Sequence, residues 1–335
     1  MKKLILVFLA LGTFGVAAET TQTVNIYSFR QSFLIEPILE KFTAETGIQT
    51  KVVFAKKGLI ERLKREGKYS PADVVLTSDF NKLLQLKDEG LTSEIVSEEI
   101  NKNVPAHFRD DQGQWIALTK RIRNIYASKT RVNAPQVLTY ESLAAPQFKG
   151  KVCTRSGKHP YNLGLIASMI AHKGEAEAET WLQGVKANLA RKPQGNDRAQ
   201  VKAIKEGLCD VSLGNSYYYG KMLENAEQKP WADAVNIVYP NQNDRGSHVN
   251  VSGAVITKYA PNKSNALKLL TFLSSEKAQQ TYASVNMEYP VNPRVKPAAI
   301  VLSWGEFKED TLPLTKVAEY REAALKLVDK VKFDL

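Results

Sequence analysis

The sequence lacks the short patterns that mark several common enzyme classes. It contains no G-x-S-x-G stretch for a nucleophilic serine and no G-x-G-x-x-G or G-x-x-x-x-G-K-[ST] loop for a nucleotide. Its four histidines have no H-x-x-x-H spacing for zinc, and its two cysteines form no C-x-x-C pair. These absences argue against a nucleotide-dependent enzyme or a zinc enzyme, and they leave a hydrolase as an alternative without a supporting motif.

Long hydrophobic runs are also missing, except at the N-terminus. There Lys2 and Lys3 precede an apolar run from Leu4 to Val16, and small residues follow up to Ala18. This order is typical of a secretory signal peptide. The run is shorter than the ~20 residues of a membrane span, although a membrane anchor is the alternative interpretation. We expect cleavage after Ala18 and an exported mature chain that does not insert into the membrane.

A concentrated block of one charge is absent as well. The chain has 46 Lys and Arg against 35 Asp and Glu, a net charge of +11, and its basic residues are spread along the sequence. Nucleic-acid binding favours a basic stripe interleaved with aromatic residues, and export makes such a partner still less expected. We therefore predict no nucleic-acid partner. An acidic or anionic ligand, or simply a basic exterior, explains this charge better.

Strand-like and helix-like segments alternate along the chain. Strands are predicted at 23–29, 48–55 and 71–78 with amphipathic helices between them, an order that implies a parallel sheet with helices on its faces. A second α/β set begins near residue 123, and one long helix around 313–331 closes the chain. No flexible linker separates the sets, so 335 residues indicate two lobes joined by crossing strands.

The two cysteines, Cys153 and Cys209, both lie in short strand-like runs. An exported protein meets an oxidising compartment, where a disulfide between them is expected. Two separate buried thiols are the alternative.

Tyrosine is the residue type that stands out. Tyr161 lies in "SGKHPYNLG", where a loop enters a helix, and "SYYYG" places three tyrosines, 217–219, at a strand-to-helix junction. Open α/β sheets bind ligands at the carboxyl ends of their strands. Phenolate is a hard oxygen donor that suits ferric ion, and a bound cation can deprotonate a tyrosine whose free pKa is near 10. The alternative is one core ring and two surface rings.

These tyrosine segments resemble those of the periplasmic ferric-ion binding proteins, the substrate-capturing components of iron ABC importers. The resemblance runs through nearly the whole mature chain and is most specific in "GKVCTRSGKHPYN" and "EGLCDVSLGNSYYYGKM". It implies a type II periplasmic-binding-protein fold, two α/β lobes joined by crossing strands with a ligand cleft between them. It also implies ferric iron, Fe(3+), bound by Tyr161, Tyr217 and Tyr218, whereas Tyr219 packs.

The expected division of the chain follows the same resemblance. Residues 1–18 form the signal peptide, residues 19–120 and 246–295 the N-terminal lobe, and residues 121–245 and 296–335 the C-terminal lobe.

One departure from the family concerns the first strand. Many relatives carry a His, often followed by Tyr, after the "YS-x-R" segment, whereas this chain has Gln31 and Ser32 there. The departure resembles a subset that uses three tyrosines and carbonate as a synergistic anion. We expect Arg155 to hold that anion first, because guanidinium matches carboxylate-like geometry. The further candidates are Arg30 and Gln31 from the facing lobe and Arg121 and Arg123 near the crossing strand.

The family also implies a location and partners. We expect a periplasmic monomer, not an enzyme, that delivers iron to an inner-membrane ABC permease and its ATPase. The alternative within the same fold is a binding protein for a polyamine, thiamine or an oxyanion, and the alternative outside it is an exported hydrolase.

Overall fold

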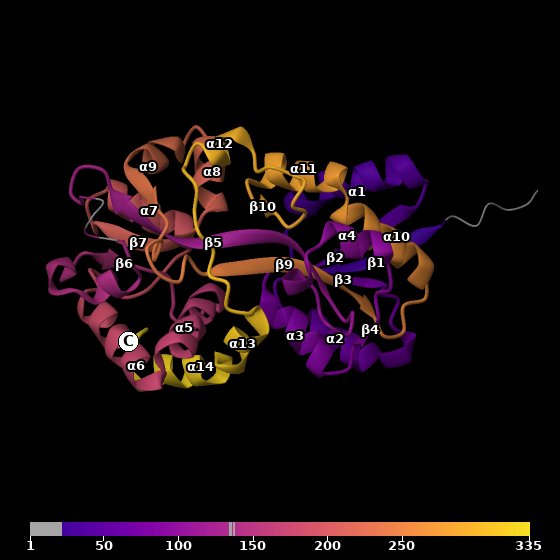
Figure 1. The fold of residues 1–335 in the computed structure, drawn as a ribbon, viewed down its shortest axis with the longest axis horizontal. Coiled ribbons are helices and arrows are strands. Elements are labelled where there is room, and N and C mark those ends of the chain that lie inside the picture. The colour runs from indigo at the N-terminus through magenta and orange to yellow at the C-terminus, as the bar shows by residue number, and fades with distance from the viewer. Residues whose placement is uncertain (1–21, 134–135, 137) are drawn as a thin grey trace, which may run out of the picture.

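The computed structural model describes residues 22–133, 136 and 138–335, so the expected signal peptide lies outside the described residues. Two α/β lobes lie side by side, with long strands running between them (Figure 1). Among the described residues, no helix has both the length and the apolar character needed to cross a bilayer.

The N-terminal lobe is built on three parallel strands in the order β2-β1-β3. Its elements are β1 (Thr23–Ser28), α1 (Ser32–Thr46), β2 (Gln49–Phe54), α2 (Leu59–Glu66), β3 (Val74–Thr77), α3 (Phe80–Asp88), β4 (Thr92–Ser93), α4 (Glu98–Asn103), α10 (Lys263–Ser274), α11 (Glu276–Asn286) and β10 (Tyr289–Pro290). Helices α1 and α2 lie on opposite sides of the sheet (Figure 1). The predicted parallel sheet with helices on both faces is confirmed.

Local signals set the ends of the helices in this lobe. Gly47 ends α1 with a φ of 71°, a left-handed conformation that glycine adopts without steric cost. Asp79 caps α3, because its carboxylate accepts the backbone N–H of Lys82 at 3.4 Å. Since Asp79 comes two residues after β3, this cap brings a carboxylate to the carboxyl edge of the sheet.

The C-terminal lobe has its own sheet, in which β7 pairs parallel with β6 and antiparallel with β5 (Ile116–Ser128). Besides β5, this lobe contains β6 (Val152–Cys153), α5 (Pro160–Lys173), α6 (Glu175–Ala187), α7 (Asp197–Lys205), β7 (Val211–Asn215), α8 (Tyr217–Leu223), α9 (Lys229–Asp233) and β8 (Val235–Val238). Cys153 and Cys209 form a disulfide with their Cα atoms 5.9 Å apart, which ties β6 to the segment before β7.

Two strands cross between the lobes. Strand β5 pairs with β9 (Val249–Thr257) up to Ile122 and with β7 from Arg123 onward, so one strand belongs to both sheets. Strand β9 runs antiparallel to β5 and continues into the N-terminal sheet beside β3. The prediction of crossing strands is confirmed, and the point where β5 changes partner lies between two arginines.

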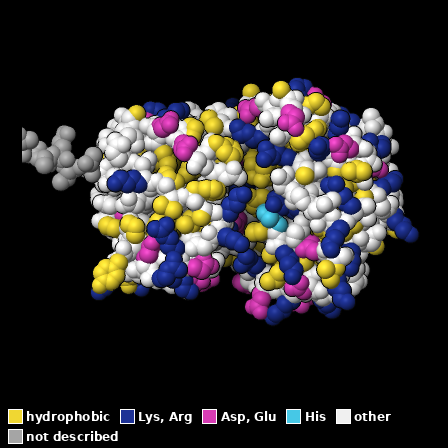
Figure 2. Space-filling model, turned by 180° about the vertical axis from the view of Figure 1, so that it is seen from behind, with side chains coloured by type: hydrophobic (Ala, Val, Ile, Leu, Met, Phe, Trp, Pro, Cys, Tyr) yellow, Lys and Arg dark blue, Asp and Glu magenta, His cyan; other side chains and the backbone are white. Residues whose placement is uncertain are grey.

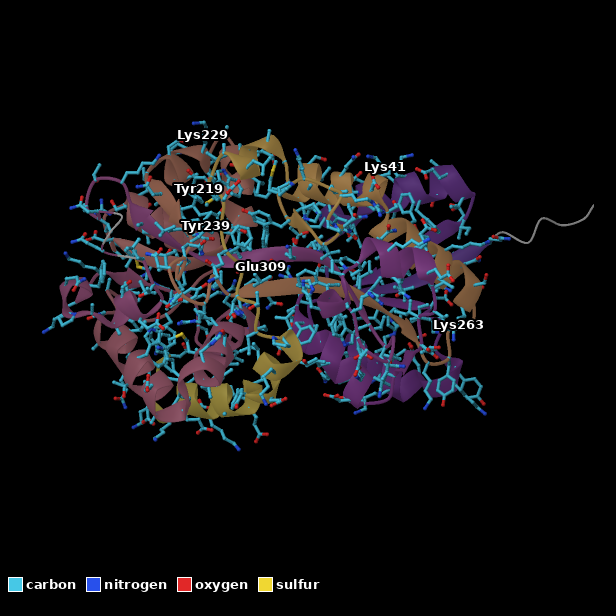
Figure 3. All side chains as sticks on the ribbon, in the orientation of Figure 1. Lys41, Tyr219, Lys229, Tyr239, Lys263 and Glu309 are labelled. Atoms are coloured by element: carbon cyan, nitrogen blue, oxygen red, sulfur yellow. A yellow bond between two sulfur atoms is a disulfide. The ribbon has the colours of Figure 1, made fainter. Side chains whose placement is uncertain are left out.

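The end of the chain returns to the crossing strands. Ser247 N–H donates to the carbonyl of Lys308 at 2.9 Å, and Asp310 N–H donates to the carbonyl of Ser247 at 2.9 Å. Glu309 forms a 2.9 Å ion pair with Lys120 of β5 and lies in the middle of the molecule (Figure 3). Residues 308–310 are therefore joined to β5 and to the segment just before β9.

The prediction of one long final helix around 313–331 was wrong. The structure has α12 (Ala299–Leu302), then α13 (Leu314–Glu319) and α14 (Arg321–Lys330), with a break at Tyr320. The break lets α13 pack against α3 of the other lobe while α14 stays on α5 and α6 (Figure 1). A contact between lobes thus overrides a continuous helical pattern.

Each lobe buries a separate hydrophobic core. Phe42 and Trp115 belong to the core of the first lobe, and Phe148 and Trp181 to the core of the second. The exact residue boundaries given above for the two lobes stay a prediction.

Candidate functional site

A cleft of about 690 Å³ lies between the two lobes. The N-terminal lobe contributes Gln31, Lys56 and Asp79 to its lining, and the C-terminal lobe contributes Tyr161 and Tyr217, among others. Figure 2 shows a groove between the lobes, bordered by Lys and Arg side chains and a histidine. The cleft is therefore a candidate site for an anion or an anionic complex.

Tyr161 reaches this cleft from the first turn of α5. Pro160 occupies the first position of the helix, where its missing N–H costs no hydrogen bond. The Nδ1 atom of His159 accepts the backbone N–H of Tyr161 at 3.2 Å, and the two rings meet edge to face with centroids 4.6 Å apart. The loop after β6 and the cap of α5 thus fix the position of the phenol.

His159 is neutral in this arrangement. Burial, followed by the positive charge of Arg155, lowers the pKa of His159 to about 3. Because Nδ1 is the acceptor, the ring proton is assigned to Nε2.

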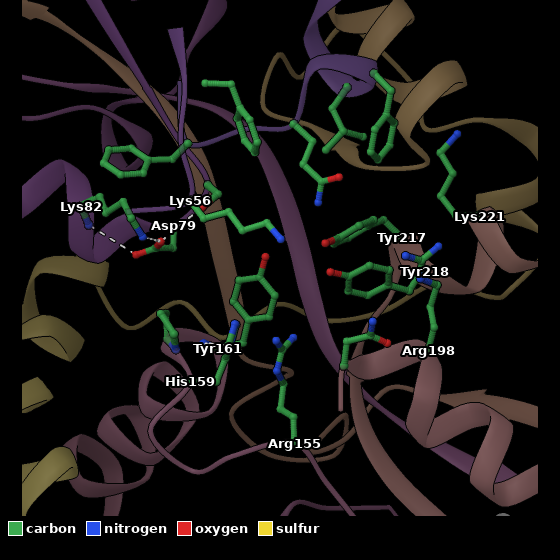
Figure 4. A pocket seen from close by; sticks show the side chains of 18 of the residues that line it. Lys56, Asp79, Lys82, Arg155, His159, Tyr161, Arg198, Tyr217, Tyr218 and Lys221 are labelled. Carbon is green, nitrogen blue, oxygen red and sulfur yellow. Dashed lines mark hydrogen bonds and ion pairs between the residues drawn. The ribbon is translucent and has the colours of Figure 1, made fainter. Parts of the chain in front are cut away.

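Tyr217 and Tyr218 reach the cleft from the first two positions of α8, directly after β7. Their ring centroids are 4.1 Å apart with an angle of 33° between the planes. Figure 4 shows their hydroxyl groups and that of Tyr161 pointing into the same space. Three phenols from two strand-to-helix junctions of one lobe are therefore brought together.

Tyr219 faces away from this space. Its ring packs against Trp304 with centroids 5.3 Å apart and against Tyr126 at 6.2 Å, and it does not line the cleft. Adjacent helical residues point about 100° apart, so the three consecutive tyrosines divide between the cleft and the packed interior.

The environment of Tyr217 and Tyr218 favours their neutral forms. Burial raises the pKa of Tyr217 well above its usual value, and the neighbouring Tyr161 and Tyr218 raise it further. Burial and then Tyr161 also raise the pKa of Tyr218. Both phenols therefore carry their protons at neutral pH unless a cation displaces them.

Arg155 is the arginine of the predicted anion set that lines the cleft beside the phenols. Its guanidinium carbon lies 5.3 Å from the Tyr161 ring centroid, and its Nη1 donates to Asp197 at 3.1 Å. Gln31 also lines the cleft, from the facing lobe. These two predicted residues are at the surface that a ligand would meet.

The other three predicted arginines are not part of the cleft lining. Arg30 is buried against Glu288 at 2.7 Å, and Arg123 is buried against Asp197 at 2.8 Å. Arg121 lies 3.6 Å from Glu288 and also donates to the carbonyl of Ser78. Their guanidinium groups are thus held by protein partners behind the cleft.

Arg121 and Arg123 nevertheless act on the phenols through their charge. The guanidinium carbon of Arg121 lies 5.8 Å from the Tyr161 ring centroid and 5.9 Å from that of Tyr217, and Arg123 lies 5.9 Å from Tyr161. Positive charges at this range stabilise a phenolate. The change of partner in β5 therefore places two cations directly behind the tyrosines.

Sequence reasoning missed four cationic residues of the cleft, namely Lys56, Lys82, Arg198 and Lys221. Lys56 comes two residues after β2 and Arg198 is the second residue of α7. The tyrosines were located by their proximity to the carboxyl end of a strand. The same signal could have identified Lys56.

The donor set limits the metals that suit this cleft. Among the described residues, no group of three or more His, Cys, Asp or Glu side chains could hold a metal ion. The three phenols are hard oxygen donors once deprotonated, and they suit a small trivalent cation. Chemically, the arrangement can take up such a cation in exchange for protons.

Known proteins are similar to this chain in both sequence and structure. A family model described as bacterial extracellular solute-binding protein matches residues 54–303. Iron uptake protein A1 of Synechocystis sp. is 42% identical over 312 residues, 92% of this chain and 87% of that protein. The crystal structure of Pasteurella haemolytica apo ferric ion-binding protein A is 54% identical with a TM-score of 0.90, covering 94% of this chain and 99% of that one. A Trichodesmium protein in complex with iron and citrate ligands is 38% identical with a TM-score of 0.88, covering 93% and 99%.

Proposed function

This chain belongs to the bacterial extracellular solute-binding proteins and has the type II periplasmic-binding-protein fold, and we propose that it captures ferric iron in the cleft between its lobes. Relatives named for iron uptake and ferric-ion binding cover nearly the whole chain, which supports iron as the solute. The observation that carries the proposal is the convergence of Tyr161, Tyr217 and Tyr218 in one cleft.

The ligand set that we propose is the three phenolates and an anion. Ferric iron takes about six donors in octahedral geometry, so three phenolates leave places for a bidentate anion and a water molecule. Carbonate is the anion we favour, and we propose Arg155 as the residue that holds it; the position of its guanidinium beside Tyr161 supports this role. Three phenolates balance the charge of the metal, and a divalent anion then leaves a net negative centre in a cation-lined cleft.

The role that follows is transport rather than catalysis. We propose that the loaded monomer delivers its iron from the periplasm to an ABC permease and its ATPase in the inner membrane. The basic lining of the cleft argues against a polyamine as the solute, since Lys56 and Arg198, which have no carboxylate partner among the described residues, would repel it.

The test is a visible absorption spectrum of iron-stripped protein during addition of ferric iron as a weak chelate, with and without bicarbonate. We expect a tyrosinate-to-iron charge-transfer band that is lost or strongly reduced in Tyr161→Phe, Tyr217→Phe and Tyr218→Phe. Tyr219→Phe is the matched control, because Tyr219 lies next to the site but packs against Trp304, and its band should equal that of the wild type. Absence of any band in the wild-type protein would contradict the proposal.

A further inference from the structure

Lys56 is the cation that faces the tyrosines from the opposite lobe. It lies in the loop between β2 and α2, and it lines the cleft together with Tyr161 and Tyr217. Figure 4 shows its ammonium group extending from the N-terminal lobe toward the hydroxyl groups of these two tyrosines. The next residue, Lys57, is exposed on the same loop and does not line the cleft.

Lys56 differs from most other cations of the cleft in its contacts. Lys82 is paired with Asp79 at 2.5 Å, Arg155 with Asp197 at 3.1 Å, and Lys221 with Glu224 at 3.0 Å. Among the residues that the structure describes, Lys56 has neither a hydrogen-bond partner nor an ion-pair partner for its side chain. Its charge therefore remains available to a ligand.

Arg198 is the other cleft cation without a carboxylate partner, but it belongs to the tyrosine lobe. It lies 5.8 Å from the Tyr218 ring centroid and contacts Gln228 at 3.5 Å. An interaction that holds the two lobes together has to come from the facing lobe. Lys56 is the residue of that lobe that meets this requirement, because Lys82 is already neutralised and Gln31 carries no charge.

The occupied site supplies a partner of the opposite sign. Under the proposed function, ferric iron and three phenolates are neutral together, so the anion leaves the centre negative. A carbonate that binds iron through two oxygens has a third oxygen without a metal bond. An ammonium group that reaches this oxygen forms a charge-assisted hydrogen bond, which is stronger than a neutral one.

We propose that Lys56 is the positioning residue that closes the cleft by binding the outer oxygen of the iron-bound anion. This inference rests on the proposed function. It makes closure conditional on the anion, because Lys56 has no oxygen to bind when iron is held by the tyrosines alone. The specificity that follows is for anions that keep an oxygen free after binding iron, a property of carbonate and of larger carboxylates.

The experiment compares wild type, Lys56→Gln, Lys56→Arg and the matched control Lys57→Gln, each with ferric iron and bicarbonate. The charge-transfer band reports iron on the tyrosines, small-angle X-ray scattering reports closure, and transfer to a competing chelator reports release. We expect Lys56→Gln to keep the band, lose the decrease in radius of gyration, and release iron about 10- to 100-fold faster, the range for one hydrogen bond to a charged group. Lys56→Arg should restore closure, and Lys57→Gln should match the wild type.

Two results would overturn the inference, and both can be distinguished from a result that contradicts the proposed function. If Lys56→Gln closes and releases iron like Lys57→Gln, Lys56 has no role in closure although iron still binds. If the wild type shows the band but no compaction with bicarbonate, binding of the anion does not close the cleft. A wild type without a band removes both proposals. Equal melting temperatures of the iron-free variants exclude misfolding as the cause of any difference.

Discussion

Asp197 accepts a hydrogen bond from Arg155, with 3.1 Å between its Oδ1 atom and Nη1 of the arginine. Its Oδ2 atom accepts from Arg123 at 2.8 Å and from the backbone N–H of Asn215 at 3.0 Å. Burial alone would raise the pKa of this carboxyl group, but the charges of Arg123 and Arg155 outweigh burial and hold the pKa below its usual value. One fully buried carboxylate therefore links the cleft arginine to the crossing strand and to the end of β7.

Asp197→Asn is expected to lower stability and to weaken the use of the anion. Removal of one partner leaves Arg123 buried without its counter-charge, a change that costs about 3–5 kcal/mol in the free energy of unfolding. Urea unfolding measures this loss. Without Asp197 the guanidinium of Arg155 is no longer held in position, and the bicarbonate concentration needed for the iron band measures how far anion binding is weakened. The control is Asp233→Asn, whose pair with Lys229 is half exposed and should change stability by less than about 1 kcal/mol. Equal effects of both substitutions would contradict the role of Asp197.

Iron uptake is expected to release protons. The raised pKa values of Tyr217 and Tyr218 keep both phenols protonated at neutral pH, so each must lose its proton when it binds the metal. Binding through Tyr217 and Tyr218 therefore releases at least two protons per ferric ion, and the apparent iron affinity falls as the pH falls because protons compete for the same oxygens. Titration at constant pH, corrected for the chelate alone, counts the protons. Tyr219→Phe should release the same number, and binding without proton release would rule out phenolate ligands.

His248 is expected to make the protein less stable in acid. Burial lowers its pKa to about 4, and Asp310 offsets only part of that effect. The usual pKa of about 6.5 applies to the unfolded chain, so between pH 6.5 and 4 the unfolded state binds a proton that the folded state does not. The contribution of His248 to stability therefore falls as the pH falls through this window, by about 3 kcal/mol at most, and this contribution changes no further below it.

Urea unfolding at pH 7.0, 5.5 and 4.5 tests the role of His248. His248→Gln should flatten the decline toward acid, whereas His107→Gln, which changes an exposed histidine, should leave the decline as it is in the wild type. An unchanged slope in His248→Gln would show that other groups cause the acid sensitivity.

Gly214→Ala is expected to disturb the strand that ends at the tyrosines. An added Cβ would lie 2.2 Å from Cε2 of Tyr126, whose hydroxyl donates to the carbonyl of Asn215 at 2.7 Å. Overpacking of this kind costs about 1–3 kcal/mol, and a shift at Asn215 moves the start of α8. Thermal unfolding and the intensity of the iron band check both effects. Ser212→Ala is the control on the same strand. Its buried hydroxyl has no hydrogen-bond partner among the residues that the structure describes, so this substitution should be close to neutral.

The position of the tyrosines could be predicted because it depends on local features. Tyr217 and Tyr218 follow β7 directly, and Tyr161 follows a loop and a proline at a helix start. Adjacent helical residues diverge by about 100°, so one member of the triplet had to face elsewhere. The sequence therefore indicated where the phenols lie before any contact between lobes was known.

The states of the arginines could not be predicted in the same way. Arg30 is neutralised by Glu288, which lies 258 positions away in the sequence, and Arg123 by Asp197, which lies 74 positions away. Such pairs leave no local pattern, since only the tertiary fold brings the partners together. The same limit applies to Lys56, whose position opposite the tyrosines depends on how the two lobes face each other.

All three tyrosines belong to one lobe, while Lys56 belongs to the other, and this division separates two events in time. Colour should develop in a step whose rate is proportional to the iron concentration, because it needs only an encounter with the three phenols of one lobe. Compaction should follow in a first-order step whose rate is independent of iron, because it is a motion of one molecule about β5 and β9. A rapid-mixing experiment that follows both absorbance and X-ray scattering would then show iron binding to the tyrosines first and closure of the cleft afterwards.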